Sequence, residues 1–226
     1  MTIGVFKFSS CDGCQLAFFE MEEEFFKLPS ISYFLEAQSV NEYGHFDVSF
    51  VEGSVSSGED EERIKDIRKR SKVLIAIGAC AVSGGIQSVG NLEKLLNTRP
   101  IKDYVYVDHE LVGCPISVHS LRDFFIALLS GKTLLLQDYP VCLECKRKGV
   151  VCLPVSRDET CLGPVTRGGC GAICPSYSRG CYGCYGPVSK PNIKAFLGAF
   201  PKGEEYIKLS CNAYNKVYRE SLWRFE

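Results

Sequence analysis

Thirteen cysteines in a chain of 226 residues constrain this sequence more than any other feature. The N-terminal segment MTIGVFKFSS lacks a charged region, an apolar run of signal length and a twin-arginine pair, so we expect a cytoplasmic protein that is not exported. Structural disulfides are disfavoured in that reducing compartment, and an odd number of cysteines does not fit a closed disulfide framework. Metal binding is therefore the leading explanation for the thiols.

The rest of the composition is that of an ordinary globular protein, with 46% apolar and 23% charged residues. The length suffices for one core and a smaller second unit. A formal charge of -1 provides no overall field that would attract nucleic acid or anionic lipid. The longest apolar runs, such as residues 124–129, are too short to cross a bilayer. We therefore expect neither a nucleic-acid partner nor insertion into a membrane.

Short strands alternate with helical segments over residues 1–132, which we predict to form the first domain. The predicted strands, each rich in Val, Ile, Phe or Tyr, cover residues 3–8, 32–37, 46–51, 72–77 and 103–107. Strands that alternate with helices predict an α/β fold, here a flavodoxin-like doubly wound parallel sheet.

Three segments between or after these strands have helical character. One follows Cys14, one covers residues 57–70 with Ser57 as its N-terminal cap, and one follows Pro115 and ends at Gly131. The expected buried residues are Phe18, Met21, Phe25 and Leu28 in the first helix and Val118, Leu121, Phe125, Leu128 and Leu129 in the third.

Four cysteines of the first domain follow predicted strands. Cys11 and Cys14, in SSCDGC, come after the first strand, Cys80, in GACAVSGG, after the fourth, and Cys114, in VGCP, after the fifth. Because the carboxyl ends of parallel strands share one edge of the sheet, we predict that these four thiols converge there. Four thiolates can hold a 4Fe-4S cluster or a zinc ion, and the spacing alone does not decide between them.

The predicted second domain, residues 133–226, is loop-rich and holds all nine remaining cysteines, eight of them between many Gly and Pro residues. Eight thiols suffice for two four-thiolate sites, and the end of the segment CGAICP resembles a bacterial ferredoxin run, although zinc ribbons remain an alternative. The sequence leaves the partition of the eight open. Cys211 remains, and we expect a buried thiol there. The eight are Cys142, Cys145, Cys152, Cys161, Cys170, Cys174, Cys181 and Cys184.

Taken in order, the segments SSCDGC, VEGSV, GAC with SGG, and GCP resemble the small subunit of nickel-iron hydrogenases, over nearly the whole chain. This resemblance implies a proximal 4Fe-4S cluster on Cys11, Cys14, Cys80 and Cys114, facing a nickel-iron centre in a separate large subunit. It also implies that the second domain carries two further 4Fe-4S clusters. The chain would then relay electrons and would be active only in complex with the large subunit.

Glu52, in the segment VEGSV, follows the third predicted strand. The resemblance implies that it lies near the proximal cluster and contributes to a proton path, whereas its alternative interpretation is a surface carboxylate. No other acid-base or nucleophilic constellation stands out in the chain, so we predict no catalytic residue here beyond Glu52.

The family resemblance also distinguishes hydrogenase subunits from the related quinone-reductase subunits. The related quinone-reductase subunit has adjacent cysteines where this chain has Cys11-Asp12-Gly13-Cys14, so the spacing favours a hydrogenase, and Asp12 is expected to be a turn residue. All three histidines lie in the first domain, which suggests ligation by cysteine alone. The cytoplasmic branch implies iron-sulfur and flavin subunits as partners, which exchange electrons with NAD(P) or another acceptor. A quinone-reductase-type subunit and a zinc-stabilised interaction module remain the rivals.

Basic residues of the second domain have two explanations. Residues 146–148 with Arg167, Arg179 and Lys190 could form a docking face for an acidic electron carrier, or they could neutralise anionic clusters. The sequence leaves both open.

Overall fold

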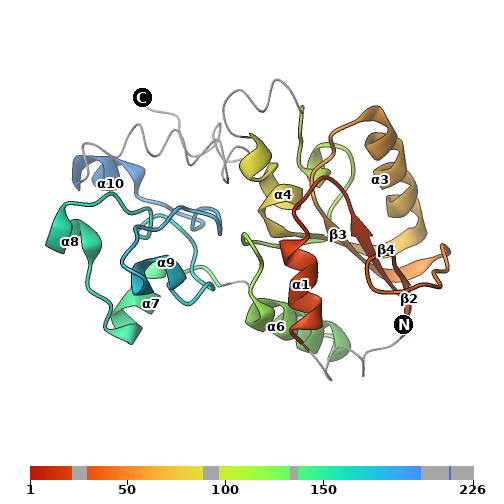
Figure 1. Ribbon diagram of the computed structural model, residues 1–226, viewed down its shortest axis with the longest axis horizontal. Coiled ribbons are helices and arrows are strands. Elements are labelled where there is room, and N and C mark those ends of the chain that lie inside the picture. Colours follow the sequence, from red (N-terminus) through yellow and green to blue (C-terminus); the bar gives the residue numbers. More distant parts are fainter. Residues whose placement is uncertain (22–29, 89–96, 133–136, 200–213, 215–226) are drawn as a thin grey trace.

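Five parallel strands form a single sheet at the centre of the first unit (Figure 1). The computed structural model describes residues 1–21, 30–88, 97–132, 137–199 and Tyr214. In chain order the strands are β1 (Ile3–Lys7), β2 (Ile31–Phe34), β3 (Phe46–Glu52), β4 (Ser71–Ile77) and β5 (His109–Leu111). Their spatial order is β2-β1-β3-β4-β5, and every pairing is parallel. The predicted doubly wound α/β fold is therefore confirmed.

Helices cover both faces of this sheet (Figure 1). Helices α1 (Gly13–Phe19) and α6 (Val118–Leu129) pack on one face, and α3 (Gly58–Arg70) and α4 (Gly78–Ser83) pack on the other. Side chains of a strand alternate between the two faces, so Ile3 and Val5 of β1 enter the first core while Phe6 enters the second. This double burial explains why the strands are apolar almost throughout.

The helix boundaries agree with local signals. Ser57 caps α3, because its hydroxyl accepts a hydrogen bond from the Asp60 backbone N–H at 3.1 Å. In α6, Leu121 and Phe125 are buried as expected, but Leu129 is 55% exposed. The expectation for Leu129 is wrong because the helix ends at that residue, and Phe124 is buried instead.

The fifth strand lies later in the chain than predicted. The expected strand at 103–107 is wrong, since residues 101–103 form the short 3-10 helix η2 (Ile101–Asp103) and β5 begins only at His109. Val105 and Val107 pack against the second core from an irregular segment, which accounts for their apolar alternation. Pairing with β4 starts at Asp108, whose N–H donates to the Leu74 carbonyl at 2.9 Å.

In the described residues, the cysteine-rich unit is built from loops and four short helices. These are α7 (Val141–Lys148), α8 (Leu153–Arg157), α9 (Ile173–Ser176) and α10 (Ile193–Ala199). Its small core includes Val141, Leu162 and Phe196 together with Cys161 and Cys181. It contacts the first unit where the Tyr185 hydroxyl donates to the Pro115 carbonyl at 3.4 Å. Loops held by so small a core are what the composition predicts.

Several expectations fall on residues outside the described ranges. These are Phe25 and Leu28 of the first helix, Cys211, and the linker at the predicted domain boundary. Within the described ranges, no helix combines the length and the apolar character needed to cross a bilayer.

Candidate metal centres

The turn between β1 and α1 carries the first two thiols. Asp12 adopts the left-handed conformation, with φ 66°, and its carboxylate pairs with Lys7 at 2.8 Å. Asp12 is therefore a turn residue, as predicted. The turn leaves Cys11 exposed and buries Cys14, to whose sulfur the Ile116 backbone N–H donates.

Cys80 and Cys114 approach the same edge from β4 and β5. Cys80 lies in α4, which follows β4 directly, and Cys114 lies in the loop after β5. Burial, together with the neighbouring Cys114 and Cys11, raises the pKa of Cys80 to about 12. The pKa of Cys14 is also raised, chiefly by burial, with contributions from Cys80 and Cys114. The structure thus brings together four thiols that are up to about a hundred residues apart in the chain.

Two glycines make room for these sulfur atoms. A Cβ on Gly78 would lie 2.3 Å from the Cys14 sulfur, and one on Gly85 would lie 2.5 Å from the Cys80 sulfur. Both glycines also have positive φ angles, of 82° and 67°. Any larger residue would displace a thiol, so the backbone here is shaped around the sulfur atoms.

Glu52 lies at the carboxyl end of β3, beside these thiols, and is only 2% exposed. Its Oε1 accepts the Cys14 backbone N–H at 3.0 Å, while its Oε2 has no hydrogen-bond partner within the geometric limits among the described residues. Burial raises the pKa of this carboxyl to about 7. The alternative of a surface carboxylate is therefore wrong. Because its pKa lies near neutrality, this group can exchange a proton at physiological pH.

Two further residues at this edge were not identified from the sequence. Gln15, next to Cys14, is 2% exposed, and both polar atoms of its amide lack partners in the part of the chain that the structure describes. Tyr214 comes from the C-terminal segment, and its hydroxyl donates to the Cys114 sulfur. Neither position belongs to a recognisable motif, and Tyr214 reaches Cys114 only through the tertiary fold.

In the cysteine-rich unit, four thiols line one cavity of about 160 Å³. Three of its walls come from α7, from the segment leading into α8, and from the loop at Gly163. A Cβ on Gly163 would lie 3.3 Å from one of these sulfur atoms and 3.5 Å from another, so the loop is fitted closely around them. We call this set the cavity thiols: they are Cys142, Cys145, Cys152 and Cys161.

Four further cysteines of this unit lie in the described residues, and we call them the inner thiols: Cys170, Cys174, Cys181 and Cys184. Burial raises the pKa of Cys184 to about 12, with contributions from Cys114, Cys170 and Cys174. Cys181 lies against the cavity set, because its backbone N–H donates to the Cys161 sulfur at 3.2 Å. The inner thiols therefore adjoin both other groups.

All twelve cysteines in the described part of the chain are free thiols. Within the same residues, no three Cys, His, Asp or Glu side chains meet closely enough to hold a single metal ion. The donor set is nevertheless that of an iron-sulfur protein, with three groups of four cysteines and glycines packed against the sulfur atoms. The residues present fit iron-sulfur clusters held by cysteine thiolates.

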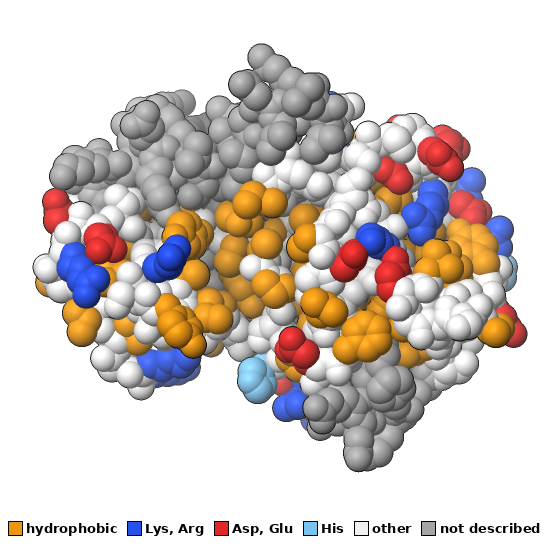
Figure 2. Space-filling model, viewed as in Figure 1, with side chains coloured by type: hydrophobic (Ala, Val, Ile, Leu, Met, Phe, Trp, Pro, Cys, Tyr) orange, Lys and Arg blue, Asp and Glu red, His pale blue; other side chains and the backbone are white. Residues whose placement is uncertain are grey.

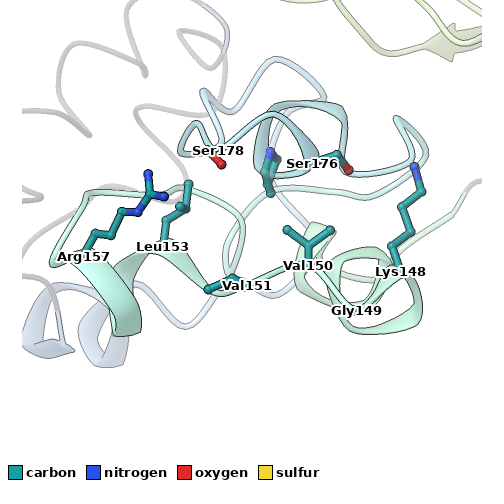
Figure 3. Close-up of a pocket in the computed structure, with 9 residues that line it drawn as sticks. Lys148, Gly149, Val150, Val151, Leu153, Arg157, Ser176 and Ser178 are labelled. Atoms are coloured by element: carbon teal, nitrogen blue, oxygen red, sulfur yellow. The ribbon is translucent and has the colours of Figure 1, made fainter.

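A groove of about 560 Å³ lies beside the cavity thiols (Figure 3). Lys148 and Arg157 lie at its two ends, and Ser176 and Ser178 line one side. Leu153 and the partly exposed Val151 line both the groove and the cavity. The cavity thiols are therefore separated from a basic, solvent-facing surface by only a thin apolar wall.

Comparisons with known proteins agree with this arrangement. Residues 11–128 match the family described as NADH ubiquinone oxidoreductase, 20 Kd subunit. The chain is 39% identical to sulfhydrogenase 2 subunit delta of Pyrococcus furiosus, over 85% of this chain and 89% of that protein. It is 31% identical to a subunit of the F420-non-reducing hydrogenase vhu of Methanocaldococcus jannaschii, over 83% of this chain and 82% of that one.

A solved structure of the Ni-Fe-Se hydrogenase from Desulfomicrobium baculatum shares the fold, with a TM-score of 0.62 and 15% identity over 88% of this chain and 98% of that chain. The curated relatives are subunits of hydrogenases, which are oxidoreductases. The chain therefore belongs to the family of the 20 kDa subunit of NADH ubiquinone oxidoreductase, together with these two hydrogenase subunits.

Proposed function

We propose that this chain is the electron-transfer subunit of a nickel-iron hydrogenase and that it carries three 4Fe-4S clusters. The observation that carries the proposal is the grouping of twelve free thiols into three sets of four. When bound, each cluster supplies a one-electron carrier whose potential depends on burial, hydrogen bonds to sulfur and nearby charge.

The proximal cluster would be held by Cys11, Cys14, Cys80 and Cys114. Cys11 is exposed, so this set lies at the surface of the chain, where a centre in a separate large subunit can approach it. The Tyr214 hydroxyl and the Ile116 N–H would donate hydrogen bonds to ligand sulfur atoms. Both donors stabilise negative charge on sulfur.

The remaining two clusters would be held by the cavity thiols and by the inner thiols. This partition follows the chain order, with Cys142 to Cys161 in one set and Cys170 to Cys184 in the other. It is supported by the cavity that the first four line and by the effect of Cys170 and Cys174 on the pKa of Cys184.

These positions define a path for electrons. The inner thiols adjoin Cys114 on one side and Cys161 on the other, so the inner cluster would lie between the other two. The path would end at the cavity thiols, because Cys152 is exposed there. A partner subunit would exchange electrons with this chain at that end.

Apolar side chains with basic and acidic ones among them lie on this side of the cysteine-rich unit (Figure 2). Val151 and Val155 are 66% and 86% exposed over the cavity, and Lys148 and Arg157 flank them. An apolar centre with a basic rim is complementary to an acidic iron-sulfur or flavin subunit. Changing Arg157 to Glu should slow electron transfer to that subunit but not hydrogen-dependent reduction of a small dye, whereas equal effects on both would contradict this docking site.

Glu52 would serve proton movement beside the proximal cluster. It is buried against Cys14, has one carboxylate oxygen without a partner, and has a pKa raised to about 7. A group of this kind can accept a proton and release it near neutral pH. We assign no bond-making step to any other side chain of this chain.

Copurification tests the function most directly. The chain should be isolated under anaerobic conditions from its native cells, and the proteins bound to it should be identified and analysed for metals. We expect a nickel-containing large subunit together with an iron-sulfur or flavin subunit. A chain that binds zinc and no such partner would instead support the interaction-module alternative.

A further inference from the structure

Glu144 is a buried acid in the middle of the cysteine-rich unit. It lies between Cys142 and Cys145 in α7 and is 8% exposed. Although two cavity thiols flank it in sequence, its carboxylate contacts the loop that carries Cys170. Its Oε1 accepts the Gly169 backbone N–H at 2.7 Å, and its Oε2 accepts the Ala172 backbone N–H at 2.9 Å.

The loop contacted by Glu144 has an unusual backbone. Gly169, Gly171 and Ala172 have positive φ angles, of 118°, 68° and 51°. Such a backbone can point successive N–H groups toward one point and form a small anion-binding concavity. Here the Glu144 carboxylate occupies that position. Because Ala172 is not a glycine, its conformation is unfavourable unless contacts of this kind hold it.

The same helix also holds the other side of the loop. Lys148 lies four residues after Glu144, on the same face of α7, and its Nζ donates to the Gly171 carbonyl at 2.5 Å. Glu144 therefore binds N–H groups of the loop while Lys148 binds one of its carbonyls. The two side chains fix the segment of residues 169–172 against α7.

The contact extends to a candidate ligand. The Cys170 thiol donates to Glu144 Oε2 at 3.7 Å. Ligation of a metal removes the thiol proton, so the carboxylate would then lie beside a thiolate. Its negative charge would disfavour the arrival of an electron on the bound cluster, and the reduction potential of that cluster would be lower.

We propose that Glu144 is a positioning residue that links the two cluster sites of the cysteine-rich unit: it builds the Cys170 loop from the helix that carries Cys142 and Cys145. It also maintains a negative charge beside the inner cluster. This inference rests on the proposed function, since it takes the inner thiols to be cluster ligands.

Three variants of the complete complex, purified without oxygen, test the inference: Glu144→Gln, Glu144→Ala and the control Glu159→Gln, in which an exposed acid of the same unit is neutralised. Iron content and electron paramagnetic resonance spectra would be measured during a redox titration. The Gln variant keeps the length and one acceptor oxygen of Glu144 but removes its charge. The Ala variant removes the support of the loop altogether.

The Gln variant should keep its iron, and the midpoint potential of one cluster should shift to a more positive value. The Ala variant should lose one cluster, with iron falling from about twelve to about eight atoms per chain. The control should match the wild type in both measurements. A purely structural role would not produce the selective shift in potential.

Unchanged iron and potentials in both Glu144 variants would overturn the inference, and so would loss of all clusters in the Ala variant, since that indicates general unfolding. If the proposed function itself is wrong, the result differs from these outcomes, because the wild-type complex would already lack iron.

Discussion

Replacing Gly78 with alanine should displace Cys14 and remove the proximal cluster. The added Cβ would lie 2.3 Å from the Cys14 sulfur, although Cβ contacts in proteins essentially never fall below 3.0 Å. One of the two atoms must therefore move by at least about 0.7 Å. The φ angle of 82° adds a backbone cost of about 1–2 kcal/mol for any L-residue. Cys14 is buried, so its sulfur has little space into which it can move.

Iron analysis of the anaerobically purified complex measures this effect. Wild type should contain about twelve iron atoms per chain, and Gly78→Ala should contain about eight, with the signal of one cluster absent from the electron paramagnetic resonance spectrum. Gly58→Ala is the matched control. Gly58 begins α3 and has no atom within 4 Å of the added Cβ, so that variant should keep all its iron and gain up to about 0.5–1 kcal/mol in stability.

A Gly78→Ala protein with full iron content and an unchanged spectrum would refute the reasoning. It would mean that the Cys14 sulfur can leave its position without loss of the cluster, and therefore that this thiol is not a ligand.

Three further predictions concern stability and protonation in the first unit. Phe18→Ala should lower the free energy of unfolding by about 3–5 kcal/mol, because the ring is fully buried in the first core. If thermal denaturation shows that the free energy of unfolding falls by less than about 1 kcal/mol, that packing is contradicted. Ser57→Ala should cost about 1 kcal/mol through loss of the hydrogen bond to Asp60, and an unchanged melting temperature would argue against the cap. Burial raises the pKa of Glu52 from 4.5 to about 7, so the stabilisation linked to its protonation is complete below pH 4.5 and is lost as the pH rises through about 7. The melting temperature of the wild type should therefore fall relative to that of Glu52→Gln as the pH rises across this range. Parallel pH profiles of the two proteins would count against a buried, titrating carboxyl.

Local signals in the sequence were sufficient for most of the sheet and for the first helices. Apolar runs between turn residues indicated β1, β3 and β4 because strands buried on both faces must be apolar throughout. The cap at Ser57 was predictable because it is also a local interaction. The Ser57 hydroxyl accepts a hydrogen bond from the backbone N–H of Asp60, only three residues later. The order of the cysteines relative to the strands then placed four of them at one edge.

Features that depend on tertiary contacts were missed. The apolar alternation near Val105 resembles that of a strand, but those side chains pack against the core from an irregular segment, and only the position of Asp108 beside Leu74 decides where β5 pairs. Glu144 belongs to no motif in the sequence, and its partners lie 25 and 28 residues away. Tyr214 reaches Cys114 from a hundred positions along the chain. Periodicity within one segment carries no information about such pairs.

The count of iron and acid-labile sulfide per chain, made on anaerobically purified protein, tests the central claim that twelve thiolates hold three clusters. We expect about twelve atoms of each, with absorption and paramagnetic signals of 4Fe-4S clusters. Colourless protein that contains zinc instead of iron would contradict the claim, as would cysteines joined to one another in disulfides.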